Sequence, residues 1–199
     1  IINAVAPEKD SDGLTRANEE LFREGRPRFV PATARGIVEL LEHYRVPIAG
    51  KKAAVLGRSR LVGAPTALLL KKKGVLVTVC HSQTPNVSAV TRASDIIIVA
   101  TGKPKLVNGA YVRSDKTQTI VDVGITAVTD KGEERLEEEV PKKKLVGDVD
   151  FERVKDKVAA ISPVPGGVGP MTVAALFENL VEAWYDTKKR MSTNATKTY

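Results

Sequence analysis

Short apolar runs alternate with helix-like segments from Lys51 onwards, and this alternation constrains the fold more than any other feature of the sequence. Five of the runs are predicted to be strands, at residues 53–56, 75–79, 95–100, 119–123 and 159–162. The third run is continuous enough in apolar residues to be buried on both faces. Strands and helices that alternate at this spacing predict a parallel sheet covered by helices on both sides, which is an α/β fold with a doubly wound sheet.

Composition limits the classes of protein to which the chain can belong. The 199 residues make one large domain, or one domain and part of another, and 42% hydrophobic with 28% charged residues is typical of a globular protein. No apolar run approaches the roughly 18 residues that span a bilayer, so no membrane association is expected. The one cysteine, Cys80, excludes an internal disulfide framework and favours a reducing compartment; we expect it to be buried. The first residue is Ile1, and this start is interpreted as cut.

The net charge of +7 permits an acidic partner but does not identify one. Lys71, Lys72 and Lys73 end a helical stretch, where cations suit the helix dipole. Residues 142–144 are also lysines, and they follow an acidic run at 133–139, which together predict a solvated loop with its counter-charge. Aromatic residues make up only 5% and do not alternate with basic ones, so a nucleic-acid surface is not expected. A phosphorylated small molecule accounts for the charge equally well.

Three threonines are predicted to begin helices. Thr33 would cap an amphipathic helix, Thr84 would open another because Pro85 follows it, and Thr172 would cap a third after a loop rich in proline and glycine. That loop, at residues 163–172, is either a rigid connector or a surface whose bare amides face a ligand. Residues 173–185 are amphipathic, and residues 188–199 are expected to be a frayed polar tail.

The residues with chemical potential follow the predicted strands. In parallel sheets ligands bind beyond the carboxyl ends of the strands, so we expect the loops after four of them to meet there. These loops carry Gly57, Arg58 and Ser59; His81 and Ser82; Thr101 and Gly102; and Gly124 and Ile125.

The first loop is a partial match to the dinucleotide-binding pattern of three glycines. Gly57 and Gly63 are present, Ser59 takes the middle position, and no acidic residue ends the second strand to bind a ribose hydroxyl. Arg58, Ser59 and Ser82 would instead attract an adenosine 2′-phosphate, which favours NADP over NAD. A solvent-facing Arg58 and a Ser82 that only caps a turn remain the structural alternatives.

Taken together, seven motifs make the chain resemble the bifunctional methylenetetrahydrofolate dehydrogenase/methenyltetrahydrofolate cyclohydrolase family. The resemblance runs from Pro7 to about residue 183, through residues 7–13, 57–65, 80–84, 100–104, 121–125, 147–149 and 163–172. It implies a Rossmann-like NADP-binding domain at residues 47–170. It also implies remnants of a second, folate-binding α/β domain and linking helix at 1–46, a helix returning to that domain at 171–190, and a tail at 191–199.

The resemblance also implies roles for individual residues. Asp12 would hydrogen-bond the pterin ring and orient the folate, although by itself it could equally shape a turn with Gly13. The loop that closes over the folate and nicotinamide would comprise Pro165, Gly166, Gly167, Val168 and Gly169. NADP contacts would come from Gly57, Arg58, Ser59, His81, Ser82, Thr101, Gly102, Gly124 and Ile125; His43 is expected to be structural, and no metal is expected.

The implied activity is the NADP-dependent oxidation of 5,10-methylenetetrahydrofolate to the methenyl form, followed by its hydrolysis to 10-formyltetrahydrofolate. These are reactions of one-carbon metabolism that serve purine biosynthesis. The resemblance also implies a homodimer, and a cytoplasmic location is expected, with the mitochondrion as the alternative. The family's Tyr-x-x-x-Lys motif, which precedes the acidic turn and serves the hydrolysis, does not occur before that turn here. We therefore expect this chain to bind NADP with little or no cyclohydrolase activity. Smaller departures from the family are Ser11, Ala32, Ala34 and Thr126.

Two other classes of function are alternatives. The chain could be a non-catalytic nucleotide-binding module or a degenerate relative, or a basic protein that binds nucleic acid. The second alternative has little support, because no groove-reading motif accompanies the charge.

Overall fold

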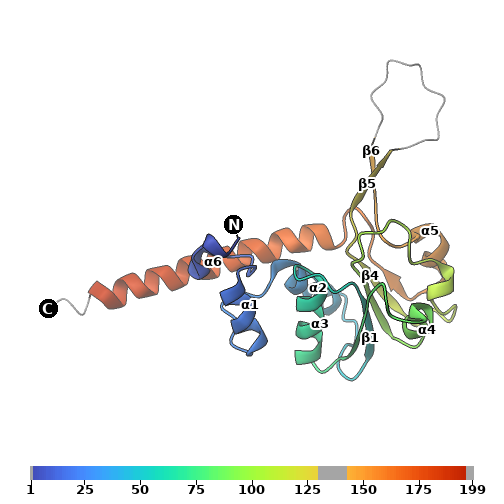
Figure 1. The fold of residues 1–199 in the computed structure, drawn as a ribbon, viewed down its shortest axis with the longest axis horizontal. Helices are drawn as coiled ribbons and strands as arrows, with labels where there is room; N and C mark the ends of the chain where they lie inside the picture. Colours follow the sequence, from blue (N-terminus) through green and yellow to red (C-terminus); the bar gives the residue numbers. More distant parts are fainter. Residues whose placement is uncertain (1, 130–142, 196–199) are drawn as a thin grey trace, which may run out of the picture.

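The computed structural model describes residues 2–129 and 143–195 (Figure 1). The α-helices are α1 (Arg16–Arg23), α2 (Ala32–His43), α3 (Gly63–Lys72), α4 (Val87–Arg92), α5 (Phe151–Val154) and α6 (Val168–Ala195). The strands are β1 (Lys52–Leu56), β2 (Leu76–Cys80), β3 (Ile96–Val99), β4 (Thr119–Asp122), β5 (Thr126–Thr129), β6 (Lys143–Val146) and β7 (Ala160–Ile161). The acidic run at 133–139 lies outside the described residues.

The predicted parallel sheet is confirmed. Its five strands have the order β2-β1-β3-β4-β7, and every neighbouring pair is parallel. Val55 in β1 lies opposite Val79 in β2 and Ile98 in β3. All of β3 is buried, as its uninterrupted run of β-branched residues predicts, because a central strand packs against other elements on both faces.

Two hydrophobic cores cover the two faces of this sheet, which makes it doubly wound. On one face, side chains of α2 and α3 such as Ile37 and Leu70 pack with Val55 and Ile98. On the other face, Ile97 and its neighbours in the sheet pack against side chains from α4, α5 and the loops beside them. Alternate residues of β3 therefore point to opposite cores, and the carboxyl ends of the strands stay open for a site.

The three predicted helix caps are wrong. Pro31 occupies the N-cap of α2, so Thr33 lies inside the helix, and Asn86 rather than Thr84 caps α4 by accepting a hydrogen bond from the Ala89 N–H. α6 begins at Val168, and the Thr172 hydroxyl donates to the Val168 carbonyl within its first turn. A helix can begin inside this proline-rich loop because the first turn leaves its N–H groups without intrahelical partners, so Pro170 costs no hydrogen bond there.

Two stretches expected to be irregular are regular. Lys143 and Lys144 belong to β6, which pairs antiparallel with β5, so the loop predicted for these lysines is wrong. Figure 1 shows this pair projecting from the body of the molecule. The tail predicted from Lys188 onwards is helical as far as Ala195.

α6 is the longest element and is only partly covered. It runs from the sheet past the N-terminal segment (Figure 1), and Val168, Ala175 and Asn179 are buried in it. Its exposed large apolar side chains are Val173, Leu176, Phe177, Leu180, Val181, Trp184 and Tyr185. Within the described parts of the chain, no helix combines the length and the apolar character needed to span a membrane.

Candidate functional site

The loops after β1, β2 and β3 meet around an open cavity of about 470 Å³ at the carboxyl ends of these strands. Six residues predicted to bind a cofactor line it together: Gly57, Arg58, Ser59, His81, Ser82 and Thr101. The remaining lining residues are Leu56, Cys80, Val87, Ala100, Lys103, Leu106 and Tyr111. The cavity therefore lies where the topology of a doubly wound sheet places a ligand.

Close backbone contacts explain the two glycines of the first loop. The Gly57 N–H donates to the Cys80 carbonyl at 2.9 Å, and a Cβ on Gly57 would lie 2.1 Å from the Ala100 oxygen. A Cβ on Gly63 would in turn lie 2.2 Å from the Gly57 oxygen. The Ser59 hydroxyl accepts from the N–H groups of Val62 and Gly63 at 3.2 and 3.4 Å, so it stabilises the start of α3. Both positions require glycine, because the turn at Gly57 packs against the backbone after β3 and the start of α3 at Gly63 packs against that turn.

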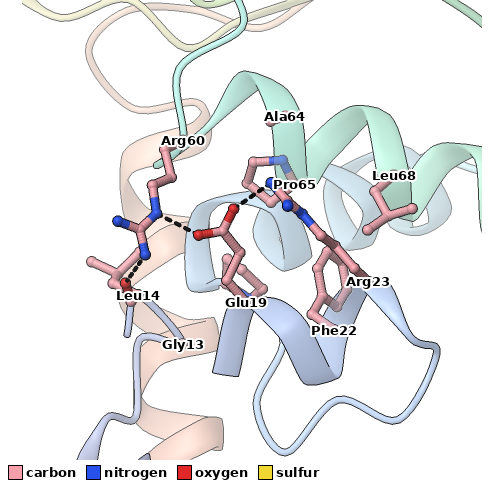
Figure 2. A pocket seen from close by; sticks show the side chains of 10 residues that line it. Gly13, Leu14, Glu19, Phe22, Arg23, Arg60, Ala64, Pro65 and Leu68 are labelled. Atoms are coloured by element: carbon pink, nitrogen blue, oxygen red, sulfur yellow. Dashed lines mark hydrogen bonds and ion pairs between the residues drawn. The ribbon is translucent and has the colours of Figure 1, made fainter. Parts of the chain in front are cut away.

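The two arginines of this loop have different surroundings. Arg60 is paired with Glu19 of α1, and its guanidinium also donates to the Leu14 carbonyl at 3.3 Å. Figure 2 shows this contact beside a separate cavity between α1 and α3, where Arg23 approaches the same carboxylate from the other side. Arg58, by contrast, is exposed at the cavity of about 470 Å³ and has no ion-pair partner within residues 2–129 and 143–195. Arg58 is thus the arginine that is free to take an anion.

The charge of the cavity wall suits a phosphate. None of the described residues that line it is acidic, whereas Arg58 and Lys103 are cationic. The His81 ring accepts a hydrogen bond from the Gln83 N–H through Nδ1 at 3.2 Å. Cys80 is buried as expected, and burial raises the pKa of its thiol, so it is not an activated nucleophile. The residues present therefore fit the phosphate-bearing half of a dinucleotide.

Several predicted residues lie outside this cavity. Gly102 follows Thr101 but does not line the cavity, Gly124 packs against Asp148, and Ile125 is 59% exposed. Gly166 and Gly167 line a different cavity of about 340 Å³, together with the end of α2 and strands β4 and β7. The peptide bond between Val164 and Pro165 is cis, and Val168 is buried. A Cβ on Gly169 would have no atom within 4 Å. Asp12 lines neither cavity.

The sequence places Lys103 in the loop after the third strand but assigns it no contact with a ligand, and it does not predict that Leu106 and Tyr111 line the cavity. Lys103 belongs to the motif at residues 100–104, which follows the third predicted strand, so its place in that motif could have indicated that it lines the cavity. Tyr111 lies in a short 3₁₀ turn far along the chain from the glycine loop, and no local pattern marks it.

The acidic turn around Asp12 is fixed by buried polar contacts. Asn179 of α6 donates through its side-chain amide to the carbonyls of Ser11 and Val30, both at 2.8 Å. The Asp12 carboxylate accepts from the Ala32 N–H at 3.3 Å. Burial raises the pKa of Asp12, the Ala32 N–H opposes this rise, and the charge of Asp10 adds to it. Asp12 is therefore held in place with a carboxyl that binds protons more readily than an exposed one.

Asp10 supports the same turn and provides a pH test. Burial alone would raise its pKa, but hydrogen bonds from Thr15, Asn18 and Leu14 outweigh this effect and hold the pKa below its usual value. A depressed pKa stabilises the fold above the unfolded-state value, near 3.8, and this contribution is lost as the pH falls through the folded-state pKa.

Replacing Asp10 with asparagine should lower the free energy of unfolding at pH 7 by about 1.5–3 kcal/mol, the range for hydrogen bonds to charged groups. The difference between Asp10→Asn and the unaltered chain should narrow as the pH falls below about 4, because the carboxylate becomes protonated first in the unfolded chain and then, at lower pH, in the folded one. Urea unfolding of both proteins at pH 7 and pH 3 measures this. A difference that is the same at both pH values would contradict the assignment.

Comparison with known proteins identifies the family. Residues 31–188 match the family model described as tetrahydrofolate dehydrogenase/cyclohydrolase, NAD(P)-binding domain. The chain belongs to the tetrahydrofolate dehydrogenase/cyclohydrolase family. Among curated members of this family, it is 43% identical to the bifunctional protein FolD of Exiguobacterium sibiricum over 92% of its own length and 61% of that protein. It is 46% identical to the FolD protein of Methanoculleus marisnigri, over 92% of its length and 60% of that protein.

Solved structures of the tetrahydrofolate dehydrogenase/cyclohydrolase family share the fold. The methylenetetrahydrofolate dehydrogenase-cyclohydrolase of Trypanosoma brucei, described as complexed with NADP cofactor and inhibitor, matches with a TM-score of 0.82 and 40% identity. That match covers 94% of this chain and 61% of that protein. The bifunctional enzyme of Thermoplasma acidophilum matches with a TM-score of 0.82 and 34% identity, over 94% of this chain and 62% of its own. The Rossmann-like fold is thereby confirmed, and the chain spans about three fifths of these relatives.

Proposed function

We propose that this chain is the NADP-binding part of a bifunctional methylenetetrahydrofolate dehydrogenase and methenyltetrahydrofolate cyclohydrolase. The enzyme would oxidise 5,10-methylenetetrahydrofolate to the methenyl form and hydrolyse that product to 10-formyltetrahydrofolate. The observation that carries the proposal is the cavity after β1, β2 and β3: among the described residues, its lining includes Arg58, which has no ion-pair partner there, and no carboxylate. When bound, NADP would supply the acceptor for the hydride that leaves the folate methylene.

The chain's own residues would bind and orient the cofactor. Arg58 and Ser82, which line the same cavity, would bind the 2′-phosphate, because a guanidinium offers paired donors to phosphate oxygens. The turn at Gly57 would let the dinucleotide approach the backbone, and Lys103 would add a second positive charge. A carboxylate at the end of β2 would repel the phosphate, and β2 ends instead in Cys80 and is followed by His81.

The folate side of the site is a further part of the proposal. Asp12 would accept hydrogen bonds from the pterin, and the loop at residues 165–169 would close over folate and nicotinamide. We assign residues 47–170 to the NADP-binding domain, 1–46 to part of the catalytic domain, and 171–190 to a helix that returns to it. The exposed apolar side chains of α6 are consistent with that return. We also propose a homodimer, a cytoplasmic location and a role in the one-carbon supply for purine biosynthesis.

Calorimetric titration with NADP and NAD tests the cofactor assignment. We expect NADP to bind more tightly than NAD, and Arg58→Ala to weaken NADP by about 10- to 100-fold, which corresponds to the loss of a charge-assisted contact. NAD binding should be nearly unchanged in Arg58→Ala, because NAD lacks the 2′-phosphate.

Arg60→Ala is the matched control, because it removes an arginine from the same loop that is already paired with Glu19. It should leave the affinity for NADP within about twofold of the unaltered chain, since Arg60 lines the separate cavity between α1 and α3 and not the one proposed to bind NADP. Equal losses in the two variants would show that the loop, and not the Arg58 guanidinium, is being measured. Absence of binding to either dinucleotide by the unaltered chain would contradict the proposed function.

A further inference from the structure

Two buried aspartates lie beneath the wall of the cofactor cavity and were not expected to have a role there. Asp122 ends β4 and is 3% exposed, and Asp148 follows β6 and is fully buried. The Asp122 carboxylate accepts three backbone hydrogen bonds, from Gly124 at 3.0 Å, Asp148 at 3.0 Å and Val149 at 2.9 Å. Asp122 thus fixes the backbone of the segment that carries Asp148.

Asp148 in turn contacts the loop after β3. One of its carboxylate oxygens, Oδ2, accepts from the Thr101 N–H at 2.6 Å, the Thr101 hydroxyl at 2.9 Å and the Gly102 N–H at 2.7 Å. The other oxygen, Oδ1, is buried and has no hydrogen-bond partner in the part of the chain that the structure describes. All the hydrogen bonds that the Asp148 carboxylate accepts therefore come from this one loop, of which Thr101 lines the cavity.

Two glycines make room for the two carboxylates. A Cβ on Gly124 would lie 2.3 Å from Asp148 Oδ1, and a Cβ on Gly147 would lie 2.0 Å from Asp122 Oδ2. Each glycine thus accommodates the carboxylate of the neighbouring segment. This packing accounts for Gly124 without any contact to a ligand.

The same contacts change the interpretation of Thr101 and Gly102. Both backbone N–H groups and the Thr101 hydroxyl hydrogen already point to Asp148, so these donors are not available to a phosphate or a nicotinamide amide. Gly102 has a φ of +66°, and the hydrogen bonds from the two consecutive N–H groups of Thr101 and Gly102 to Asp148 hold this turn. The loop therefore contributes shape to the cavity, and Asp148 determines that shape.

We propose that Asp148 is a positioning residue of the dinucleotide site, which holds the Thr101–Gly102 turn in the conformation that forms the cavity wall, with Asp122 fixing Asp148 from below. The hydrogen bonds are charge-assisted and buried, so removal of the carboxylate releases the turn and leaves its N–H groups unpaired. The proposal rests on the proposed function, because the ligand of the wall is taken to be NADP.

The test combines NADP titration with hydrogen exchange on the 199-residue chain. Asp148→Ala should weaken NADP by about tenfold or more, the effect of losing hydrogen bonds to a charged group. The amides of Thr101 and Gly102 should lose protection from exchange in the same variant, while the amides of β1 and β3 keep theirs. Asp148→Asn preserves the size of the side chain and one acceptor oxygen, and should recover part of both properties. It also serves as the informative variant should Asp148→Ala not fold.

Asp115→Ala is the matched control. Asp115 accepts from the N–H and the hydroxyl of Thr117 at 3.1 and 2.7 Å, which is the same type of contact, and neither residue lines the cavity. This variant should bind NADP like the unaltered chain. Retention of full NADP affinity in both Asp148 variants, with Thr101 and Gly102 deprotected, would overturn the proposal while leaving the proposed function intact. Failure of the unaltered chain to bind NADP would overturn both.

Discussion

Gly57→Ala is expected to lower the free energy of unfolding by about 3 kcal/mol or more and to abolish NADP binding. The new Cβ would lie 2.1 Å from the Ala100 oxygen, which is fixed backbone, and Gly57 has a φ of +113°. Overpacking of this kind costs about 1–3 kcal/mol, and a left-handed backbone adds about 1–2 kcal/mol for a residue with a side chain. Urea unfolding and NADP titration of the purified variant measure the two effects.

Gly74→Ala separates the two causes. Gly74 also has a positive φ, of +80°, but nothing lies within 4 Å of the position of its Cβ. This variant should lose only the conformational part, about 1–2 kcal/mol, and should bind NADP normally. If Gly57→Ala and Gly74→Ala lose the same stability, the close contact with Ala100 has no energetic consequence and the account of the turn is wrong.

Gly36→Val should destabilise the chain by about 3 kcal/mol, because it forces α2 away from the start of α6. A Cβ on Gly36 would lie 2.9 Å from the backbone carbon and oxygen of Met171 and 3.0 Å from the Thr172 nitrogen. Backbone atoms of a helix cannot move individually, so the whole contact between the two helices must widen. The same interface holds the ion pairs of Arg35 with Glu178 and Glu182, which would be strained together with it.

Ala174→Val is the control for this substitution. Ala174 is an exposed residue of α6, so valine there carries only the helix-propensity cost of about 0.5 kcal/mol. Thermal unfolding of the two variants in parallel measures the difference between them. A loss for Gly36→Val no larger than that for Ala174→Val would mean that the helices separate without cost.

The sheet could be predicted from the sequence because its signal is local. Each strand of the parallel sheet is a short run of apolar or β-branched residues, and Ile96–Val99 is buried along its whole length. The exact starts of the helices could not be predicted, because a threonine near a helix start has the same appearance whether it caps the helix or lies within it. Thr33 and Thr172 lie within. β6 was missed because two of its four residues are lysines, and its pairing with β5 gives no apolar alternation.

The candidate site also has a part that the sequence predicts and a part that it does not. Gly57, Arg58 and His81 follow strands directly, so the topology alone brings them together. The contacts between Asp148 and Thr101 join residues 47 positions apart, and those between Asp122 and Val149 join residues 27 apart. The pattern of residues along one sequence does not show which residues so far apart will be in contact. Their roles became apparent only when the positions of their atoms were known.

The interlocked glycines and aspartates also restrict how this sequence can diverge. A side chain at position 124 collides with the carboxylate of residue 148, and one at position 147 collides with that of residue 122. Removal of either carboxylate to relieve a collision leaves unpaired the N–H groups that it accepts from. The four positions 122, 124, 147 and 148 therefore form one epistatic unit, in which a substitution at any single position is selected against. Residues in the loops around the unit can be substituted while these four stay unchanged.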